Sequence, residues 1–319
     1  MTRKDALGMV RAGFTAAVLF LAGGVVPVLG GVLMIFAPAP VLGYAVGLPG
    51  ALWRTAGAIA LAAVLIGLGA GPLGALGYAL TLGLATAVMA YMLERRKPFE
   101  LIVMCTVATI LVAGALAALA FVGSPAALAG ILHHDLMTAM GRGEKFYKML
   151  GMETGISTAT RADIVEATIR LSPALAAISA AFTVLINLGV FWRLSGKQQR
   201  VGYMLFGDLV RWATPEWLIW MLLVTGFGMF VPVTALSTIF LDCFVCVAAV
   251  YFCQGLAIMA FYFKVLAMPP LARGLIYFVT VVQPVLAVLV CAAGIFDLWI
   301  DFRRLKPPSQ EARNFGDFL

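Results

Sequence analysis

The side chains of this sequence that could do chemistry are polar groups inside long apolar segments. Tyr251, Gln254 and Tyr262 recur at helical spacing within one such run, so they share a face of the expected helix. That face either hydrogen-bonds to a neighbouring helix or lines a cavity for a small solute. Two amides in other apolar runs, Asn187 and Gln283, are candidate partners. The ligand-binding candidates are therefore Asn187, Tyr251, Gln254, Tyr262 and Gln283.

A stripe of small side chains follows the opposite face of the same expected helix. Its members recur every three or four residues, which favours close packing against another helix. They are Cys246, Ala249, Cys253, Ala257 and Ala260. We expect this Cys–Ala stripe to be the packing face.

The string GIFDLWIDFRR closes the last apolar run. Asp297, Asp301 and Arg304 lie at positions i, i+4 and i+7, which stacks them on one face if the helix continues. Asp301 and Arg304 are also spaced to form an ion pair. The group either anchors the helix at the membrane edge or docks a cytoplasmic protein partner.

Other residue types give little sign of catalysis. His133 and His134 are adjacent, so on a helix they point about 100° apart and make a poor chelate. Cys243 and Cys246 have no second cysteine pair to complete a zinc or redox site. The sequence contains no P-loop, nucleophile elbow or HExxH motif. We expect no metal, no cofactor and no enzyme activity.

Composition identifies the environment. Of 319 residues, 63% are hydrophobic and 12% are charged, about half the charged share typical of a soluble domain. The net charge of +7 comes from basic residues between the apolar runs, where headgroups would meet them. This placement favours the lipid bilayer over nucleic acid as a partner and predicts a multi-pass membrane protein.

The predicted fold is an all-α bundle of about eight transmembrane helices. The expected spans are residues 13–36, 52–69, 72–93, 101–122, 173–192 and 217–230, followed by two between 233 and 305. Pro38 and Pro40 are expected to stop the first helix, and Gly71-Pro72 to turn between the second and third. Residues 1–305 are expected to form one transmembrane domain, with interfacial amphipathic helices over 124–171 and a polar tail over 306–319.

Several strings resemble a known family. Pro38 to Pro40, Trp212 to Trp217, YFCQGLAIMAFYF from Tyr251 and GIFDLWIDFRRL from Gly294 look like the uncharacterised YybS-like family of bacterial membrane proteins. The resemblance implies a polytopic protein of the bacterial cytoplasmic (inner) membrane and carries over no functional residue.

The same family is similar, more distantly, to the S components of energy-coupling-factor transporters and to MreD. That similarity rests on the proline-flanked first loop and the Gly71-Pro72 turn. It implies small-solute binding or transport, with a membrane scaffold or assembly role as the alternative.

Overall fold

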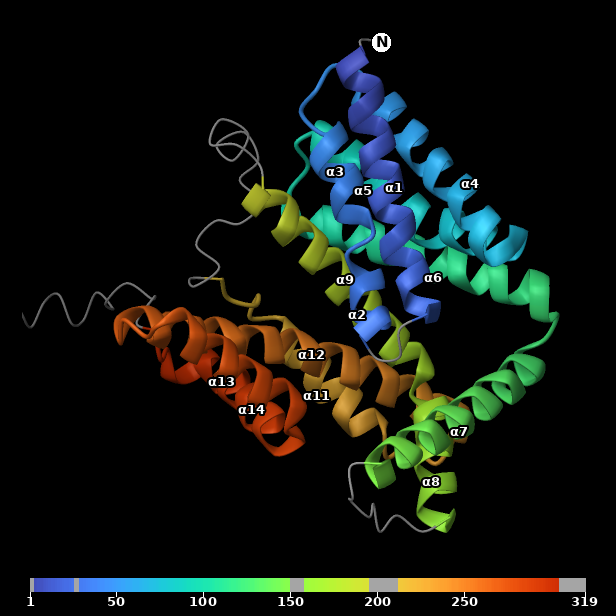
Figure 1. Ribbon diagram of the computed structural model, residues 1–319. Helices are drawn as coiled ribbons and strands as arrows, with labels where there is room; N and C mark the ends of the chain where they lie inside the picture. The colour runs from blue at the N-terminus through green and yellow to red at the C-terminus, as the bar shows by residue number, and fades with distance from the viewer. Residues whose placement is uncertain (1–2, 26–28, 150–157, 195–211, 304–319) are drawn as a thin grey trace, which may run out of the picture. The chain divides into compact units, whose positions relative to one another are not determined.

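A computed structural model describes residues 3–25, 29–149, 158–194 and 212–303. Every regular element in these ranges is a helix (Figure 1), which confirms the all-α prediction. The chain forms two compact units, Met1–Phe206 and Gly207–Leu319. The expectation that residues 1–305 act as a single domain stays a prediction, and each unit is described by itself below.

The first helix starts and ends earlier in the chain than expected. Helix α1 (Arg3–Val25) is followed by α2 (Leu29–Ile35), which packs back along α1. A Cβ added to Gly30 would lie 1.9 Å from the Ala22 carbonyl oxygen, so the two backbones touch there. The continuous span expected over residues 13–36 is therefore wrong.

The Pro38 to Pro40 segment begins a helix as well as ending one. Helix α3 runs from Pro38 to Ala45. Proline is tolerated in the first turn of a helix because the N–H groups there have no intrahelical acceptor. At the far end of α3, the Tyr44 hydroxyl donates to the Asp5 carbonyl at 2.7 Å. The pair α2–α3 thus returns the chain to the end where α1 starts.

The predicted turn at Gly71-Pro72 is present. It lies within α4 (Ala51–Tyr78), where Gly71 takes the non-helical values φ 78° and ψ 173°. A π-helical segment (Ala79–Gly83) and α5 (Leu84–Glu94) follow. A Cβ on Gly83 would lie 3.0 Å from Cγ2 of Ile59, so the segments before and after the Gly71 turn pack against each other.

The remaining helices of the first unit are α6 (Phe99–Val122), α7 (Pro125–Met149), α8 (Thr158–Arg170) and α9 (Ser172–Leu194). The helices α6 and α9 match the fourth and fifth expected spans. The polar interval forms α7 and α8, which an ion pair joins at 2.5 Å between Glu144 and Arg161. Their location at a membrane surface stays a prediction.

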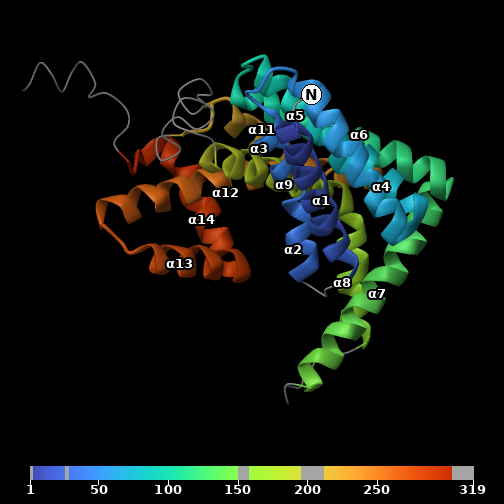
Figure 2. The same ribbon diagram turned by 45° about the horizontal axis from the view of Figure 1, so that its top comes forward.

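The second unit contains α11 (Leu218–Gly228), α12 (Thr234–Val265), α13 (Pro270–Val282) and α14 (Pro284–Ile300). The last expected span is not one helix, because α13 and α14 meet at an angle of 102° (Figure 2). Pro284 explains the break: the residue before a proline avoids the helical region, and Gln283 has φ −94° and ψ 107°.

The face of α12 that packs against α14 is the one that carries Tyr251, Gln254 and Tyr262 (the Tyr–Gln face), not the Cys–Ala stripe. Tyr251, Gln254 and Gly255 are buried, whereas the Cys–Ala stripe is only partly buried. A Cβ on Gly255 would meet the Val290 carbonyl oxygen at 2.0 Å, and one on Gly294 would meet that of Tyr251 at 2.1 Å. Two glycines therefore allow α12 and α14 to touch through their backbones.

Five helices in the described ranges are long and apolar enough to cross a membrane, or six if the bent pair α13–α14 counts as one span. They are Asp5–Gly24, Ala51–Glu94, Phe99–Val122, Ser172–Leu194 and Thr234–Val265. The chain is thus built as a multi-pass membrane protein, and the count of eight spans stays a prediction.

Candidate functional site

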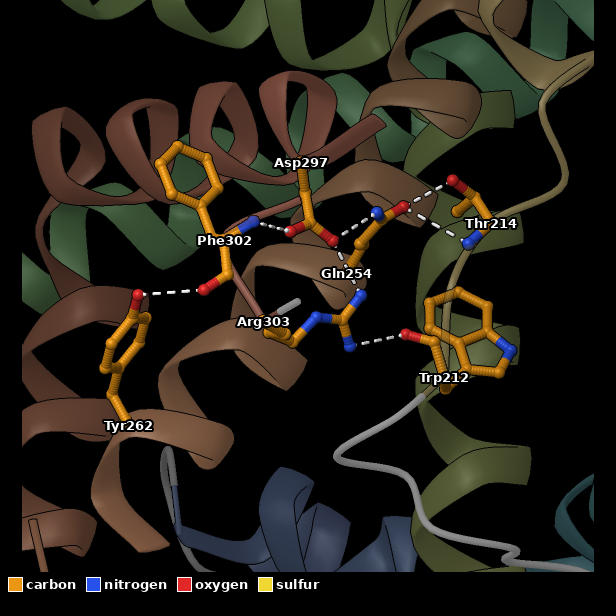
Figure 3. A network of polar contacts seen from close by, with 7 residues as sticks. All are labelled: Trp212, Thr214, Gln254, Tyr262, Asp297, Phe302 and Arg303. Carbon is orange, nitrogen blue, oxygen red and sulfur yellow. Dashed lines mark hydrogen bonds and ion pairs between the residues drawn. The ribbon is translucent and has the colours of Figure 1, made fainter. Parts of the chain in front are cut away.

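A buried polar network lies at one end of the second unit, where α12, α14 and the segment before α11 meet (Figure 3). Its centre is Asp297, which is 5% exposed. Its Oδ2 accepts hydrogen bonds from Nε2 of Gln254 at 3.0 Å and from Nη2 of Arg303 at 2.6 Å. Its Oδ1 accepts from the backbone N–H of Phe302 at 3.0 Å. Both carboxylate oxygens are therefore bound within the protein.

Arg303 ties the network to a segment 91 positions earlier in the chain. Its Nη1 donates to the Trp212 carbonyl at 2.8 Å, and the whole residue is only 3% exposed. A buried guanidinium is stable only when it is paired and hydrogen-bonded. Asp297 and the Trp212 carbonyl supply that pairing, so the arginine fixes residues 212 and 303 to each other.

Gln254 links the carboxylate to Thr214. Its Oε1 accepts from both the backbone N–H and the hydroxyl of Thr214, and its Nε2 donates to Asp297. The opposite amide orientation would place an NH2 group against the Thr214 N–H, so this arrangement fixes it. Gln254 is 2% exposed, and both of its polar atoms are engaged inside the protein.

The local backbone explains how Arg303 reaches Asp297. Helix α14 ends at Ile300, and Asp301 takes a left-handed conformation with φ 46°. Such a residue reverses the chain at a helix end, which brings the two residues after it back over the last turn. The Tyr262 hydroxyl then donates to the Phe302 carbonyl at 3.0 Å and closes the turn from the side of α12.

The energetic role of this network follows from its burial. The free energy needed to remove two charges from water exceeds the free energy gained from their attraction, unless their other hydrogen-bonding groups also have partners. Here the carboxylate and the guanidinium have partners on three segments of chain. The loss of either charged side chain would leave the other buried without its charged partner.

Of the ligand-binding candidates, Gln254 and Tyr262 lie in or beside this network. Tyr251 is buried on the same face of α12. Gln283 lies at the bend between α13 and α14, where its backbone N–H donates to the Val279 carbonyl at 2.9 Å. Asn187 belongs to the first unit.

Asn187 completes the helix break at Pro38 to Pro40. The prolines have no N–H, and Ala37 and Ala39 donate instead to residues three positions back. The Ile35 carbonyl accepts from Nδ2 of Asn187 at 2.7 Å. Asn187 is fully buried, and its Oδ1 has no hydrogen-bond donor among the described residues.

The docking candidates have separate roles. Asp297 is the centre of the network and Asp301 is the residue that reverses the chain. Arg304 lies outside the described residues. The helical alignment expected for the three is wrong beyond Ile300, because the helix ends there.

Sequence reasoning did not select three members of the network. Arg303 was passed over for Arg304, since the spacing argument assumed a helix that continued. The Trp212 carbonyl lies 91 positions from Arg303, and Thr214 lies 40 positions from Gln254. The signal that does exist is the Trp-Ala-Thr-Pro string at residues 212–215, a polar break just before an apolar helix.

The arrangement holds the end of α14 and the segment before α11 together. Within the described ranges, no group of three or more His, Cys, Asp or Glu side chains is placed to hold a metal ion. The polar atoms of Asp297 and Gln254 face each other and the chain.

Comparison with known proteins identifies a family. No curated protein and no solved structure matches the chain. A family profile matches residues 14–298, most of the chain. The chain therefore belongs to the family described as Predicted membrane protein (DUF2232).

Proposed function

We propose that this chain is a scaffold of the bacterial cytoplasmic (inner) membrane that docks a partner protein at the network end of its second unit. The observation that carries the proposal is the buried Asp297–Arg303 pair. It holds residues 212–214 and 301–303 together at one end of α12 and α14. Because these contacts already hold the surface rigid, it loses little conformational entropy when a partner binds.

The contacts of Gln254 favour a scaffold over a solute site. A solute site needs polar groups that are free to bind the solute. Gln254 uses its carbonyl and its amide within the chain, and Tyr251 is covered by the close packing of α12 and α14. Gln254 thus acts as a contact between helices, whereas the buried Tyr251 hydroxyl has no hydrogen-bond partner among the described residues.

Charge placement supports a partner with an acidic segment on the cytoplasmic side. Lys264 is exposed at the end of α12, and Arg304 and Lys306 follow the network in sequence. No charged residue occurs from Trp217 to Leu241, the stretch that holds the opposite tip of this unit. Basic residues concentrate at the cytoplasmic side of membrane proteins, so we place the network end there.

The first unit is oriented by the same rule. Tyr44, Arg54 and the Gly47 N–H gather with Asp5 and Glu94 at one end. This end also carries Arg95, Arg96 and Lys97, all exposed. The turn at the other end, around Gly71, lies in an uncharged run from Thr55 to Leu93. We assign the basic end to the cytoplasm.

This assignment gives eight crossings. They are α1, α2–α3, the two arms on either side of Gly71, α6, α9, the stretch 212–233, in which non-helical residues lengthen α11 at both ends, and α12. It counts α2–α3 as a crossing because that pair returns the chain to the end where α1 starts. Helices α7 and α8 follow the opposite end of α6 and lie on the far surface in this proposal.

Crosslinking in membranes with a charge-reversed variant tests the scaffold proposal. Wild type should give a specific crosslinked protein partner, and Lys264→Glu should weaken that crosslink. Lys97→Glu, an equally exposed lysine of the first unit, is the matched control and should leave it unchanged. No stable crosslink, or one that ignores Lys264→Glu, contradicts the proposal.

A second candidate function, small-solute binding like that of S components, is supported by Asn187. Its buried Oδ1 is an acceptor beside a helix break, and broken helices line the solute sites of many membrane transporters. Such a solute would offer an N–H or O–H group. Mass spectrometry of the purified protein tests this: a solute retained by wild type and lost in Asn187→Leu supports the candidate, and an empty wild type opposes it.

A further inference from the structure

The bent pair α13–α14 is too short to cross a membrane in separate steps. The two helices have 13 and 17 residues, or about 20 and 26 Å at 1.5 Å per residue. The hydrocarbon core is about 30 Å thick. The pair therefore either crosses once as a broken span or enters and leaves on one side.

The direction of α14 decides between these two arrangements. Cys291 Sγ donates to the Ala248 carbonyl, and Gln254 donates to Asp297; both pairs are 43 positions apart. From the first contact to the second, the position on α12 and the position on α14 both advance by the same number of residues. The two helices therefore run in the same direction. The chain thus ends α14 at the end of the unit where α12 also finishes, and the hydrogen bond from Tyr262 to Phe302 joins the two there.

Helix α13 leaves from that same end. Its Tyr277 ring meets the Phe263 ring of α12 edge to face, with centroids 5.2 Å apart. The chain then turns by 102° at Gln283 and comes back as α14. Figure 2 shows α13 diverging from α12, with α14 returning between them. The excursion begins and ends at the network end.

The surface of this excursion matches hydrocarbon. No charged residue occurs from Gly274 to Phe296. Large apolar side chains are exposed on both arms: Leu275, Phe278, Val281, Val282, Val285, Val288 and Leu289. At the bend, the Gln283 N–H donates to Val279 and the Gln283 carbonyl accepts from Ala287. Paired backbone groups are what a segment in lipid requires.

We propose that α13–α14 is a re-entrant hairpin that enters the bilayer from the network end and returns to it, with its apolar face against lipid acyl chains. Charge fixes the side of entry, since Lys264 and Arg273 flank the start of the hairpin while its tip is uncharged. The uncharged surface continues over both arms, which suits acyl chains better than the mixed polar surface of a protein partner. The inference rests on the membrane location proposed above but not on partner docking.

Cysteine labelling of the full-length protein in sealed vesicles of known orientation tests this hairpin. Lys264→Cys and Ser309→Cys should react with a membrane-impermeant maleimide from the same side. Val282→Cys, near the tip, should react from neither side. The native cysteines lie in apolar helices, so unmodified protein sets the background. Labelling of positions 264 and 309 from opposite sides, or of position 282 from the side opposite 264, overturns the proposal.

A fluorescence measurement tests the contact with lipid. Bimane attached at Val282→Cys should be quenched by phosphatidylcholine carrying a nitroxide on its acyl chain. Bimane at Lys264→Cys should be quenched less by the same lipid. If the lipid does not quench bimane at position 282, the face is covered by protein and the assignment fails. Both positions are exposed, so these variants keep the buried contacts of the unit.

Discussion

Removal of Arg303 is the sharpest perturbation of the buried network. In Arg303→Met an unbranched apolar side chain replaces the guanidinium, so Asp297, which is 5% exposed, loses its charged partner. Breaking a buried ion pair by removing one member costs about 3–5 kcal/mol, because the other charge stays buried. The Trp212 carbonyl also loses its donor. We expect a loss of stability at the upper part of that range.

The double variant Arg303→Met with Asp297→Leu separates charge from hydrogen bonding. It removes both charges, so the penalty of an unpaired carboxylate disappears. The Phe302 N–H and Gln254 Nε2 lose their acceptor, and an unsatisfied buried group costs about 1–3 kcal/mol. The double variant should therefore lose less unfolding free energy than the two single variants lose together, by at least about 1.5 kcal/mol.

Thermal or denaturant unfolding in detergent, followed by tryptophan fluorescence, measures these differences. Lys264→Met is the matched control, because it removes an exposed cation from the same end of the unit. It should change the free energy of unfolding by less than about 0.5 kcal/mol. If the Arg303→Met and Asp297→Leu effects simply add, or if Arg303→Met behaves like the control, the network does not hold this end of the unit together.

Three further predictions follow from single contacts. Gly294→Ala should lower the stability of the second unit by about 1–3 kcal/mol, because its Cβ would lie 2.1 Å from a carbonyl oxygen; Gly274→Ala, with open space, should be nearly neutral in the same unfolding assay. Asn187→Leu should destabilise the first unit by about 1–3 kcal/mol, since a buried carbonyl loses its donor, and a stability equal to wild type would show that water reaches that carbonyl. Glu144 has its pKa lowered to about 2 by hydrogen bonds and charge from Arg161 and then Lys148. The α7–α8 contact that it makes should therefore be fully present above about pH 4.5 and be lost as the pH falls toward 2; a spin-label distance between the helices that already changes at pH 5, or that is unaltered in Glu144→Gln, would contradict this assignment.

The helical, membrane-spanning character of the chain could be predicted because it depends only on apolar run length. The turn at Gly71 was predictable for a similar reason, since Gly-Pro inside an apolar run has few other conformations available. The break at Gln283 carried the same kind of signal in Pro284, but proline is tolerated inside membrane helices. Sequence alone could not decide whether this one bends the helix.

The candidate site was predicted only in part. Gln254 stood out as a polar group in an apolar helix, which needs a partner, and Asp297 stood out through its helical spacing to Asp301 and Arg304. Their pairing with each other could not be predicted, since it depends on α14 packing in the same direction as α12. Arg303 was missed because the local conformation of Asp301, not helical periodicity, determines which arginine returns to the carboxylate.

The most direct test of the central claim is to purify wild type and Gln254→Leu, measuring both stability and bound small molecules. If Gln254 joins Thr214 to Asp297 as an internal contact, the variant should unfold more easily, and mass spectrometry should find the same small molecules in both. A stoichiometric small molecule that binds wild type and is lost in Gln254→Leu, with stability unchanged, would contradict the account and make the Tyr–Gln face a solute site.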